Sequence, residues 1–277
     1  MSEAPRVAVV VVSYETRETL LEGLAALEGE PTTTVVVVDN ASRDGSAAAV
    51  RDRFPSVRLI ANPENAGFAR ACNQGARESR APLLLFLNPD ATLAPGSLRT
   101  LAAILEARPR VGVVGPRTRS ANGDIQVSTG PDLSLVSEVR QRRLVRGVAR
   151  RDAAILAEAE GLHAVEREAD WVSGACLMIR RDAFDSVSGF DERFFLYEED
   201  ADLCRRVRQA GWQVLFSPSA EARHALGRSM ARSPERARLE YQRSHLLYYR
   251  KHRGWLQRAV LRALIAVRSV LANPTST

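Results

Sequence analysis

The feature that most constrains the fold is a series of short, continuous apolar runs in the first half of the chain. The first run, Val7 to Val12, is followed by leucines at helical spacing between residues 18 and 27. Later runs, with helical patterns between them, cover residues 35–38, 57–60, 83–87 and 112–114. Continuous apolar strands need cover on both faces, so the pattern predicts an α/β fold with a mostly parallel central sheet.

The alternation of strands and helices stops near residue 115. Residues 1–230 are therefore predicted to form one domain with two halves, 1–115 and 116–230, because no low-complexity linker or internal repeat divides them. Residues 231–277 are predicted to form a basic helical extension.

The positive charge of the chain is concentrated near its C-terminal end. Lys and Arg number 39 against 33 Asp and Glu, which gives a net charge of +6. Residues 221–277 carry 12 basic and 3 acidic side chains, a net +9, so the remainder is −3. Residues 1–220 are net acidic and contain no recognisable nucleic-acid-binding motif, which argues against nucleic acid as a partner. The apolar fraction of 45% excludes a disordered or collagen-like chain.

The cysteines and the apolar runs suggest a cytoplasmic location. Cys72, Cys176 and Cys204 are odd in number and far apart, which favours neither a disulfide framework nor a zinc site. The apolar run near the start is too short for a signal peptide, and no run approaches the roughly 20 residues that span a bilayer.

Polar side chains gather where the predicted strands end. Ser13-Tyr14-Glu15 follows the first strand, Asp39-Asn40 the second, and Asn88-Pro89-Asp90 the fourth. Ligands bind at the carboxyl ends of parallel strands, so these residues mark a candidate site. The oxygens of Asn88 and Asp90 suit a hard divalent cation, although Asn-Pro-Asp is also an ordinary turn sequence.

An acidic cluster lies further along, next to the aromatic residues 194, 195 and 197. Its members are Glu198, Glu199, Asp200 and Asp202. Partly apolar surroundings and like charges raise the pKa of a carboxyl group, which suits one member to proton abstraction. A helix N-terminus also attracts acids, and the two interpretations are compatible.

The four histidines differ in their setting. His224 follows an apolar segment at 212–216 and a predicted Ser-Pro-Ser turn, and Arg228 after it offers donors for anionic oxygens. A lone histidine is more often structural than functional. The other three, His163, His245 and His252, are interpreted as structural.

Taken in order, these segments resemble a known family. The motifs that carry the resemblance are Val38 to Ser46, Asn65-Ala66-Gly67-Phe68, Leu87 to Asp90, Gly189 to Phe195 and Tyr197 to Leu203. They resemble the family 2 inverting glycosyltransferases over residues 7 to about 230, above all the bacterial rhamnosyltransferases that use dTDP-rhamnose. The resemblance implies the GT-A fold. A Rossmann dehydrogenase is disfavoured because no Gly-x-Gly-x-x-Gly follows the first strand.

The resemblance also implies roles for individual residues. Asp200 would be the general base, and Asp90 with His224 would bind Mg²⁺ or Mn²⁺. Asp39 would accept the N3–H of the nucleotide base, and Asn88 would lie near the ribose. The full set expected to bind the donor is Ser13, Tyr14, Glu15, Asp39, Asn65, Gly67, Asn73, Asn88 and Arg228.

Two positions depart from the family pattern. Many members have a first aspartate where this chain has Asn88, which removes one negative charge from the metal motif. Many also have Ala-Arg-Asn where this chain has Ala71-Cys72-Asn73, so an arginine contact with the nucleotide is missing.

The acceptor would be a saccharide or a polyprenyl-diphosphate-linked saccharide, and the family groove would contain Trp171, Gly174 and Glu199. Trp171 could instead be a core residue. The arginine-rich segment 137–151 could meet a lipid diphosphate or form a solvated helix. A nucleotide-sugar-binding protein without activity is the alternative class, but it would be expected to lack Asp90 or Asp200.

The segment from Trp255 to Leu271 has the pattern of a basic amphipathic helix. Such a helix suits an anionic membrane surface, and it predicts a peripheral protein at the inner face of the cytoplasmic membrane. The alternative is a helix packed on its own domain or on a second copy in a homo-oligomer.

Overall fold

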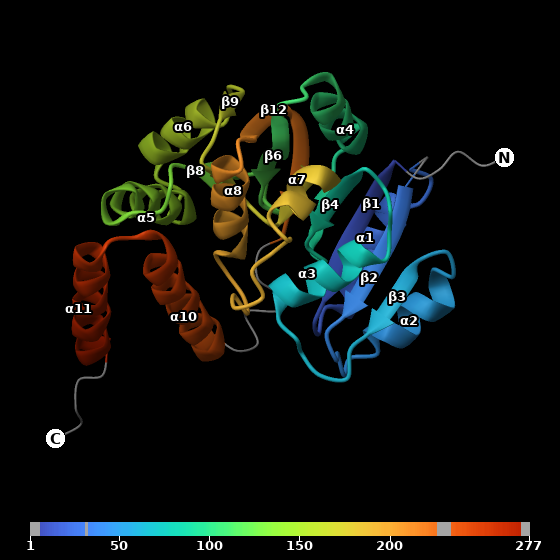
Figure 1. Cartoon of the computed structure of the whole chain (residues 1–277), viewed down its shortest axis with the longest axis horizontal. Coiled ribbons are helices and arrows are strands. Elements are labelled where there is room, and N and C mark those ends of the chain that lie inside the picture. The colour runs from blue at the N-terminus through green and yellow to red at the C-terminus, as the bar shows by residue number, and fades with distance from the viewer. Residues whose placement is uncertain (1–5, 31–32, 226–233, 273–277) are drawn as a thin grey trace.

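A mixed sheet of ten strands forms the centre of the computed structural model, which describes residues 6–30, 33–225 and 234–272 (Figure 1). A separate two-stranded sheet is made by β8 and β10. The strands are β1 (Val7–Ser13), β2 (Thr33–Asp39), β3 (Arg58–Ala61), β4 (Leu83–Leu87), β5 (Ala91–Leu93), β6 (Val111–Arg119), β7 (Ile125–Gln126), β8 (Thr129–Gly130), β9 (Arg167–Glu168), β10 (Trp171–Val172), β11 (Cys176–Arg180) and β12 (Gln213–His224).

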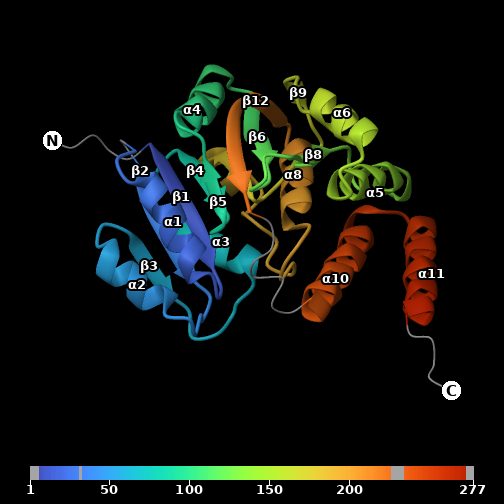
Figure 2. The same cartoon turned by 180° about the vertical axis from the view of Figure 1, so that it is seen from behind.

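Helices cover both faces of this sheet (Figures 1 and 2). Those that the structure describes are α1 (Arg17–Leu27), α2 (Ser46–Arg53), α3 (Phe68–Arg77), α4 (Ser97–Ala107), α5 (Leu135–Ala149), α6 (Ala153–Leu162), α7 (Arg181–Ser186), α8 (Glu199–Gln209), α10 (Pro234–His252) and α11 (Trp255–Ala272).

The main path of the sheet runs β3-β2-β1-β4-β11-β6-β12-β5. Strand β1 pairs in parallel with β2 on one side and β4 on the other. Strand β11 is antiparallel to both β4 and β6, whereas β12 and β6 are parallel. The prediction of a mostly parallel sheet is confirmed. Strands β2 and β3 lie on one side of β1, and β4 lies on the other side. The carboxyl ends of the parallel strands β1, β2 and β4 therefore meet at one edge of the sheet.

The valines of β1 show how one strand serves two cores. Val7, Val9 and Val11 pack with residues of α1, α2 and α4. Ala8, Val10 and Val12 point to the other face, where residues of α3, α7 and α8 cover them. This two-sided burial explains why the strand is apolar at every position.

A third, smaller core joins the C-terminal helices to the body. It contains Phe194, Ala201, Tyr248, Tyr249 and Leu261, from the segment before α8, from α8 itself, and from α10 and α11. The inner face of α11 therefore packs on its own chain, which was the alternative to a free membrane helix. The side chains on its outer face that remain exposed include Trp255, Leu256, Val260 and Leu264.

Two expected segments differ from the structure. The apolar pattern from Trp171 to Ile179 predicts a single strand, but the structure divides this segment between β10 and β11, which lie in different sheets. The expected Ser-Pro-Ser turn does not end a strand. Strand β12 continues through Pro218 with a register shift between Ser217 and Glu221, as proline permits at a bulge. The longer strand brings His224 opposite Ala91 of β5.

All three cysteines are free and buried. Burial raises the pKa of the Cys176 and Cys204 thiols to about 12. Within the described ranges, no helix has the length and apolar character needed to cross a membrane.

Gly75 tests the packing of α3 on the sheet. A Cβ at this position would lie 2.4 Å from Val10 Cγ1 and 3.2 Å from Val38 Cγ2. We expect Gly75→Ala to lower the free energy of unfolding by about 1–3 kcal/mol, because the added methyl group overpacks the core. The matched control is Gly161→Ala in α6, where a Cβ would have no neighbour within 4 Å. Urea denaturation should show that the control is as stable as the parent or more so. Equal stability of Gly75→Ala and the parent would contradict this account.

Candidate functional site

Asp39 lies at the end of β2 and presents a buried acceptor at the edge of the sheet. Its side chain is 2% exposed. One carboxylate oxygen, Oδ2, accepts a hydrogen bond from the backbone N–H of Ser42 at 3.1 Å. The other oxygen, Oδ1, is buried and has no hydrogen-bond partner among the described residues. Buried acceptors are normally satisfied, so Oδ1 is suited to an N–H donor from a ligand.

The residues after β1 hold the neighbouring loop. The backbone carbonyl of Ser13 accepts from Asn40 N–H at 2.8 Å. Glu15 has a left-handed backbone, with φ of 55°, and its Oε1 accepts from the N–H of Arg43 at 2.7 Å. Tyr14 between them is 37% exposed. Ser13 and Glu15 thus fix the loop that follows Asp39, whereas the side chain of Tyr14 is exposed.

Gly67 joins this loop to the acidic cluster. Its φ is +85°, and a Cβ there would lie 2.8 Å from both the carbonyl oxygen and Cδ2 of Phe195. The next residue, Phe68, donates its N–H to the same carbonyl at 2.7 Å. Asn65 accepts from the N–H of Gly67 at 3.0 Å. Only glycine allows this approach, so Asn65 and Gly67 form a tight turn at the start of α3.

Asn73 is placed differently from the other expected donor-binding residues. It is buried in α3, and its amide exchanges two hydrogen bonds of 2.9 Å with the backbone of Phe190. The amide also donates to Glu192 Oε1 at 3.0 Å. These contacts give Asn73 a role in holding the 189–192 turn.

Asn88 and Asp90, from the turn that follows β4, come together with His224 at the end of β12. His224 Nε2 lies 3.1 Å from Asp90 Oδ1 and 3.2 Å from Asn88 Nδ2. The sequence separates Asn88 and His224 by 136 residues. The longer β12 closes that distance, so the three side chains predicted to lie near the cation meet at one point.

Gln126, to which no sequence motif points, orients His224. Its Nε2 donates to the backbone carbonyl of His224 at 2.7 Å, which turns its Oε1 toward His224 Nδ1 at 3.2 Å. This network assigns the proton to Nδ1 and makes Nε2 an acceptor, which lies near the amide nitrogen of Asn88 as well as near Asp90. A lone pair and a carboxylate oxygen 3.1 Å apart form a suitable place for a cation.

These residues fit a divalent metal that is shared with a ligand. Within the part of the chain that the structure describes, no group of three His, Cys, Asp or Glu side chains could hold a metal alone. Asp90 and His224 would leave coordination positions for phosphate oxygens. Mg²⁺ and Mn²⁺ are commonly bound by one or two carboxylates together with the phosphates of a substrate.

Asp200 lies in the first turn of α8, at the same edge of the sheet. Its Oδ2 accepts from Gly174 N–H and its Oδ1 from Ala201 N–H, both at 2.7 Å. A Cβ on residue 174 would lie 3.2 Å from the Asp200 Cβ, so glycine lets the backbone come this close. Burial raises the pKa of Asp200, while the two N–H donors oppose that shift.

Glu199 is more deeply buried than its neighbour. It is 5% exposed, and its Oε2 has no hydrogen-bond partner among the described residues. Burial, followed by the charge of Asp200, raises the pKa of Glu199 well above its ordinary value. Within the acidic cluster, Glu199 and Asp200 thus both have a raised pKa, and Asp200 is the more accessible of the two.

His245 of α10 links two further acids, a contact that the sequence analysis missed. Its Nδ1 lies 2.6 Å from Glu198 Oε1. Its Nε2 lies 3.2 Å from Glu138 Oε2, within ion-pair distance although the N–H does not point at that oxygen. Although burial acts against its charge, the interactions with the two glutamates raise the pKa of His245 to about 9. No sequence pattern relates residues 138, 198 and 245, so their contact depends on the fold.

The expected acceptor side is only partly open. Trp171 donates its indole N–H to Pro131 O at 3.0 Å and packs against two of the cores, as in the core alternative. Segment 137–151 is largely the helix α5, in which Arg142 pairs with Glu138 and Arg143 with Glu158. Arg228 lies outside the described residues.

Comparison with known proteins agrees with this geometry. A family model described as "Glycosyltransferase like family 2" matches residues 5–242. The chain is 34% identical over 280 residues to an N-acetylglucosaminyl-diphospho-decaprenol L-rhamnosyltransferase of Mycobacterium tuberculosis, covering 95% of this chain and 91% of that protein. Rhamnosyltransferase WbbL of Escherichia coli is 40% identical over 55 residues, which is 20% of this chain and 21% of the relative.

Solved structures share the fold. A mannosyltransferase from Pyrobaculum calidifontis, solved with GDP-Man and Mn²⁺, superposes with a TM-score of 0.62 at 21% identity, covering 90% of this chain and 64% of that one. TarS 1-349 of S. aureus, solved with UDP-GlcNAc, gives a TM-score of 0.56 at 17% identity, with 88% and 66% covered. The predicted GT-A fold is confirmed.

The buried charge on His245 predicts a pH dependence of stability. The pKa is raised on folding, so its contribution is complete below the unfolded value of about 6.5 and is lost as pH rises through about 9. We expect the free energy of unfolding to fall by at most about 3 kcal/mol over this interval. Urea denaturation at a series of pH values measures it. His245→Gln, which cannot titrate, should flatten the decline; an equally steep decline in that variant would assign it to other groups.

Proposed function

Because the chain belongs to glycosyltransferase family 2, we propose that it transfers L-rhamnose from dTDP-rhamnose to a lipid-diphosphate-linked saccharide. The observation that carries this proposal is the 34% identity, over 95% of the chain, to a rhamnosyltransferase named for a diphospho-decaprenol acceptor. The transfer would invert the anomeric centre and depend on a divalent cation. It would serve the synthesis of cell-envelope polysaccharide.

Binding of the donor would use the edge where β1, β2 and β4 end. The unpaired Oδ1 of Asp39 would accept the N3–H of thymine, a bond that a carboxylate strengthens. Ser13, Glu15, Asn65 and Gly67 would fix the loops around the base and phosphates, with Tyr14 beside them. Asn88 would lie near the ribose. Asn73 would act from α3 by holding the 189–192 turn.

Asp90 and His224 would hold the cation, with Gln126 fixing the imidazole. A cation bound there would act as a Lewis acid on the diphosphate as it leaves. Asp90 brings one negative charge to this position, and His224 brings a neutral nitrogen. The leaving group itself supplies the remaining negative charges.

Asp200 would be the general base. It would take the proton from the acceptor hydroxyl, whose oxygen then forms a bond with the anomeric carbon as the bond to the diphosphate breaks. A carboxyl group with a raised pKa is a stronger proton acceptor once it is ionised. Gly174 and Ala201 would keep the ionised carboxylate in place through their N–H groups. Glu199 and Trp171 would border the acceptor.

A different UDP- or dTDP-sugar is the alternative donor. Uracil and thymine present the same N3–H to Asp39, so this contact does not separate the two nucleotides. A neighbouring fold, TarS, was solved with UDP-GlcNAc.

The outer face of α11 would hold the protein at an anionic membrane, as expected for a cytoplasmic enzyme that acts on a lipid-linked acceptor. Its exposed apolar side chains lie next to Arg262, which is also exposed. Apolar and basic side chains together favour the membrane interface. Pairing with a second copy of the chain is the alternative use of this face.

Asp200→Asn tests the base. We expect dTDP to bind within about twofold of the parent affinity, while sugar transfer falls by about 10²-fold or more because proton abstraction is lost. Isothermal titration calorimetry and a product assay separate the two. Glu199→Gln is the neighbouring control and should keep more activity than Asp200→Asn. Near-normal turnover by Asp200→Asn would move the base elsewhere, with Glu199 the next candidate.

Asp90→Ala tests the cation and the donor together. In the parent, dTDP-rhamnose with Mn²⁺ should raise the melting temperature more than other nucleotide sugars do, since a ligand of the native state stabilises it. In Asp90→Ala, the part of the shift that needs Mn²⁺ should disappear along with activity. No preference for dTDP-rhamnose in the parent would favour the alternative donor.

Leu256→Glu with Val260→Glu tests the membrane face. These side chains are 60% and 40% exposed. We expect binding to phosphatidylglycerol vesicles to weaken about tenfold or more, because each buried apolar side chain contributes about 1.5–3 kcal/mol. Added salt should weaken the parent's binding as well. Val165→Glu, a 63% exposed position outside α11, is the control. Unchanged sedimentation of the double variant with vesicles would exclude this face.

A further inference from the structure

We propose that His245 of α10 is a positioning residue for Asp200: it holds Glu198 and so fixes the backbone from which α8 begins. This inference rests on the proposed function, in which Asp200 is the base. It gives the C-terminal region a part in catalysis that is separate from membrane binding.

Helix α10 contacts three consecutive residues, 196–198, which precede the base in the sequence. Ser244 Oγ donates to the carbonyl of Leu196 at 2.7 Å. The rings of Tyr241 and Tyr197 meet edge to face, with centroids 5.8 Å apart. His245 then binds Glu198 through Nδ1 at 2.6 Å. Positions 241, 244 and 245 share one face of the helix, so a single rigid surface sets the path of residues 196–198.

The backbone of this segment needs such support. Tyr197 and Glu198 both have left-handed backbones, with φ of 71° and 62°. Residues other than glycine avoid that region, and two in succession persist only when the surroundings enforce them. Helix α8 begins at the next residue, and Asp200 follows directly. A change at residue 197 or 198 therefore changes the direction in which Asp200 leaves the turn.

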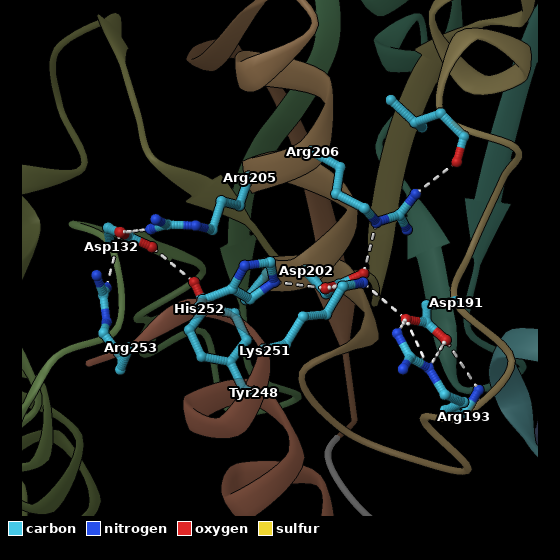
Figure 3. Close-up of polar contacts among 12 residues, drawn as sticks. Asp132, Asp191, Arg193, Asp202, Arg205, Arg206, Tyr248, Lys251, His252 and Arg253 are labelled. Atoms are coloured by element: carbon cyan, nitrogen blue, oxygen red, sulfur yellow. Dashed lines mark hydrogen bonds and ion pairs between the residues drawn. The ribbon is translucent and has the colours of Figure 1, made fainter. Parts of the chain in front are cut away.

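Helix α10 also holds Asp202, two residues after the base. Asp202 is fully buried and is bound by Lys251 Nζ and His252 Nε2, each at 2.7 Å (Figure 3). Arg206, one turn further along α8, binds its other oxygen at 2.7 Å. Contacts from α10 thus flank Asp200 on both sides, at 196–198 and at 202. Figure 3 shows Lys251 and His252 reaching Asp202 from α10.

His245 also places a positive charge near the carboxylates. The titratable and charged groups around it are Glu138, Arg142, Glu198, Tyr241 and Tyr249. Glu198 and Asp200 repel each other, and burial raises the pKa of both. Loss of the imidazolium would leave more of that repulsion uncompensated. The pKa of Asp200 should therefore rise further, and Asp200 would be ionised only at higher pH.

His245→Gln in the full chain is the deciding experiment, because glutamine carries no charge and its amide nitrogen reaches the position of Nε2 rather than that of Nδ1, which binds Glu198. We expect kcat to fall about tenfold, since small misplacements of a catalytic group have large effects, while the Kd of dTDP stays within about twofold. The acid limb of the kcat–pH profile should move to higher pH. His245→Ala should lose more kcat than His245→Gln. Arg250→Ala, an exposed change on the same helix, should match the parent in each measurement.

Parent values of kcat and of the pH limb in folded His245→Gln would overturn the inference. If circular dichroism shows that His245→Gln is not folded, Ser244→Ala is the variant that tests the inference. It removes only the bond to Leu196, and an unchanged kcat would then overturn the inference. Failure of the proposed function would give a different result, because the parent protein itself would transfer no sugar from any nucleotide sugar tested.

Discussion

Parallel pairing of β1 with β2 and β4 is the constraint on which the candidate site depends. The three strands end at one edge of the sheet, so the pairing of the strands alone makes the polar residues that follow them neighbours. The second half of the chain reaches the same edge by two routes. Strand β12 delivers His224 beside Asp90, and the N-terminus of α8 delivers Asp200 beside Gly174. Each half thus supplies groups that the other lacks.

Buried charge is compensated very unevenly across the molecule. Asp202 and Asp132 are surrounded by cationic partners, whose hydrogen bonds and charges outweigh burial and lower the pKa of both. Glu199 and Asp200 have no such partners in the contacts described, and burial raises the pKa of both. For Asp202, Glu199 and Asp200 the contrast lies within the first turn of α8. Such separation of environments is typical of sites where one carboxylate must ionise reversibly while its neighbour stays charged.

Much of this could be predicted from the sequence. The strands of the first half, Asp39, and the meeting of Asn88, Asp90 and His224 followed from local patterns and from the family resemblance, because those signals lie at strand ends. The contacts of Gln126 and Glu138 could not be predicted, since each depends on how distant elements pack. His245 looked structural for the same reason. The assumed turn at Pro218 was wrong because proline is also compatible with a bulge, and only the neighbouring strands decide between the two.

The left-handed pair at Tyr197 and Glu198 has a consequence for redesign. Glycine adopts this backbone without steric cost, so a procedure that ranks substitutions by backbone compatibility would choose glycine at either position. Such a choice would remove the phenol that meets Tyr241 or the carboxylate that meets His245. Local strain and long-range attachment are inseparable here, because the side chains that make the turn unfavourable are the ones by which α10 holds it. A turn with less backbone strain would therefore lose a contact by which α10 holds it in place.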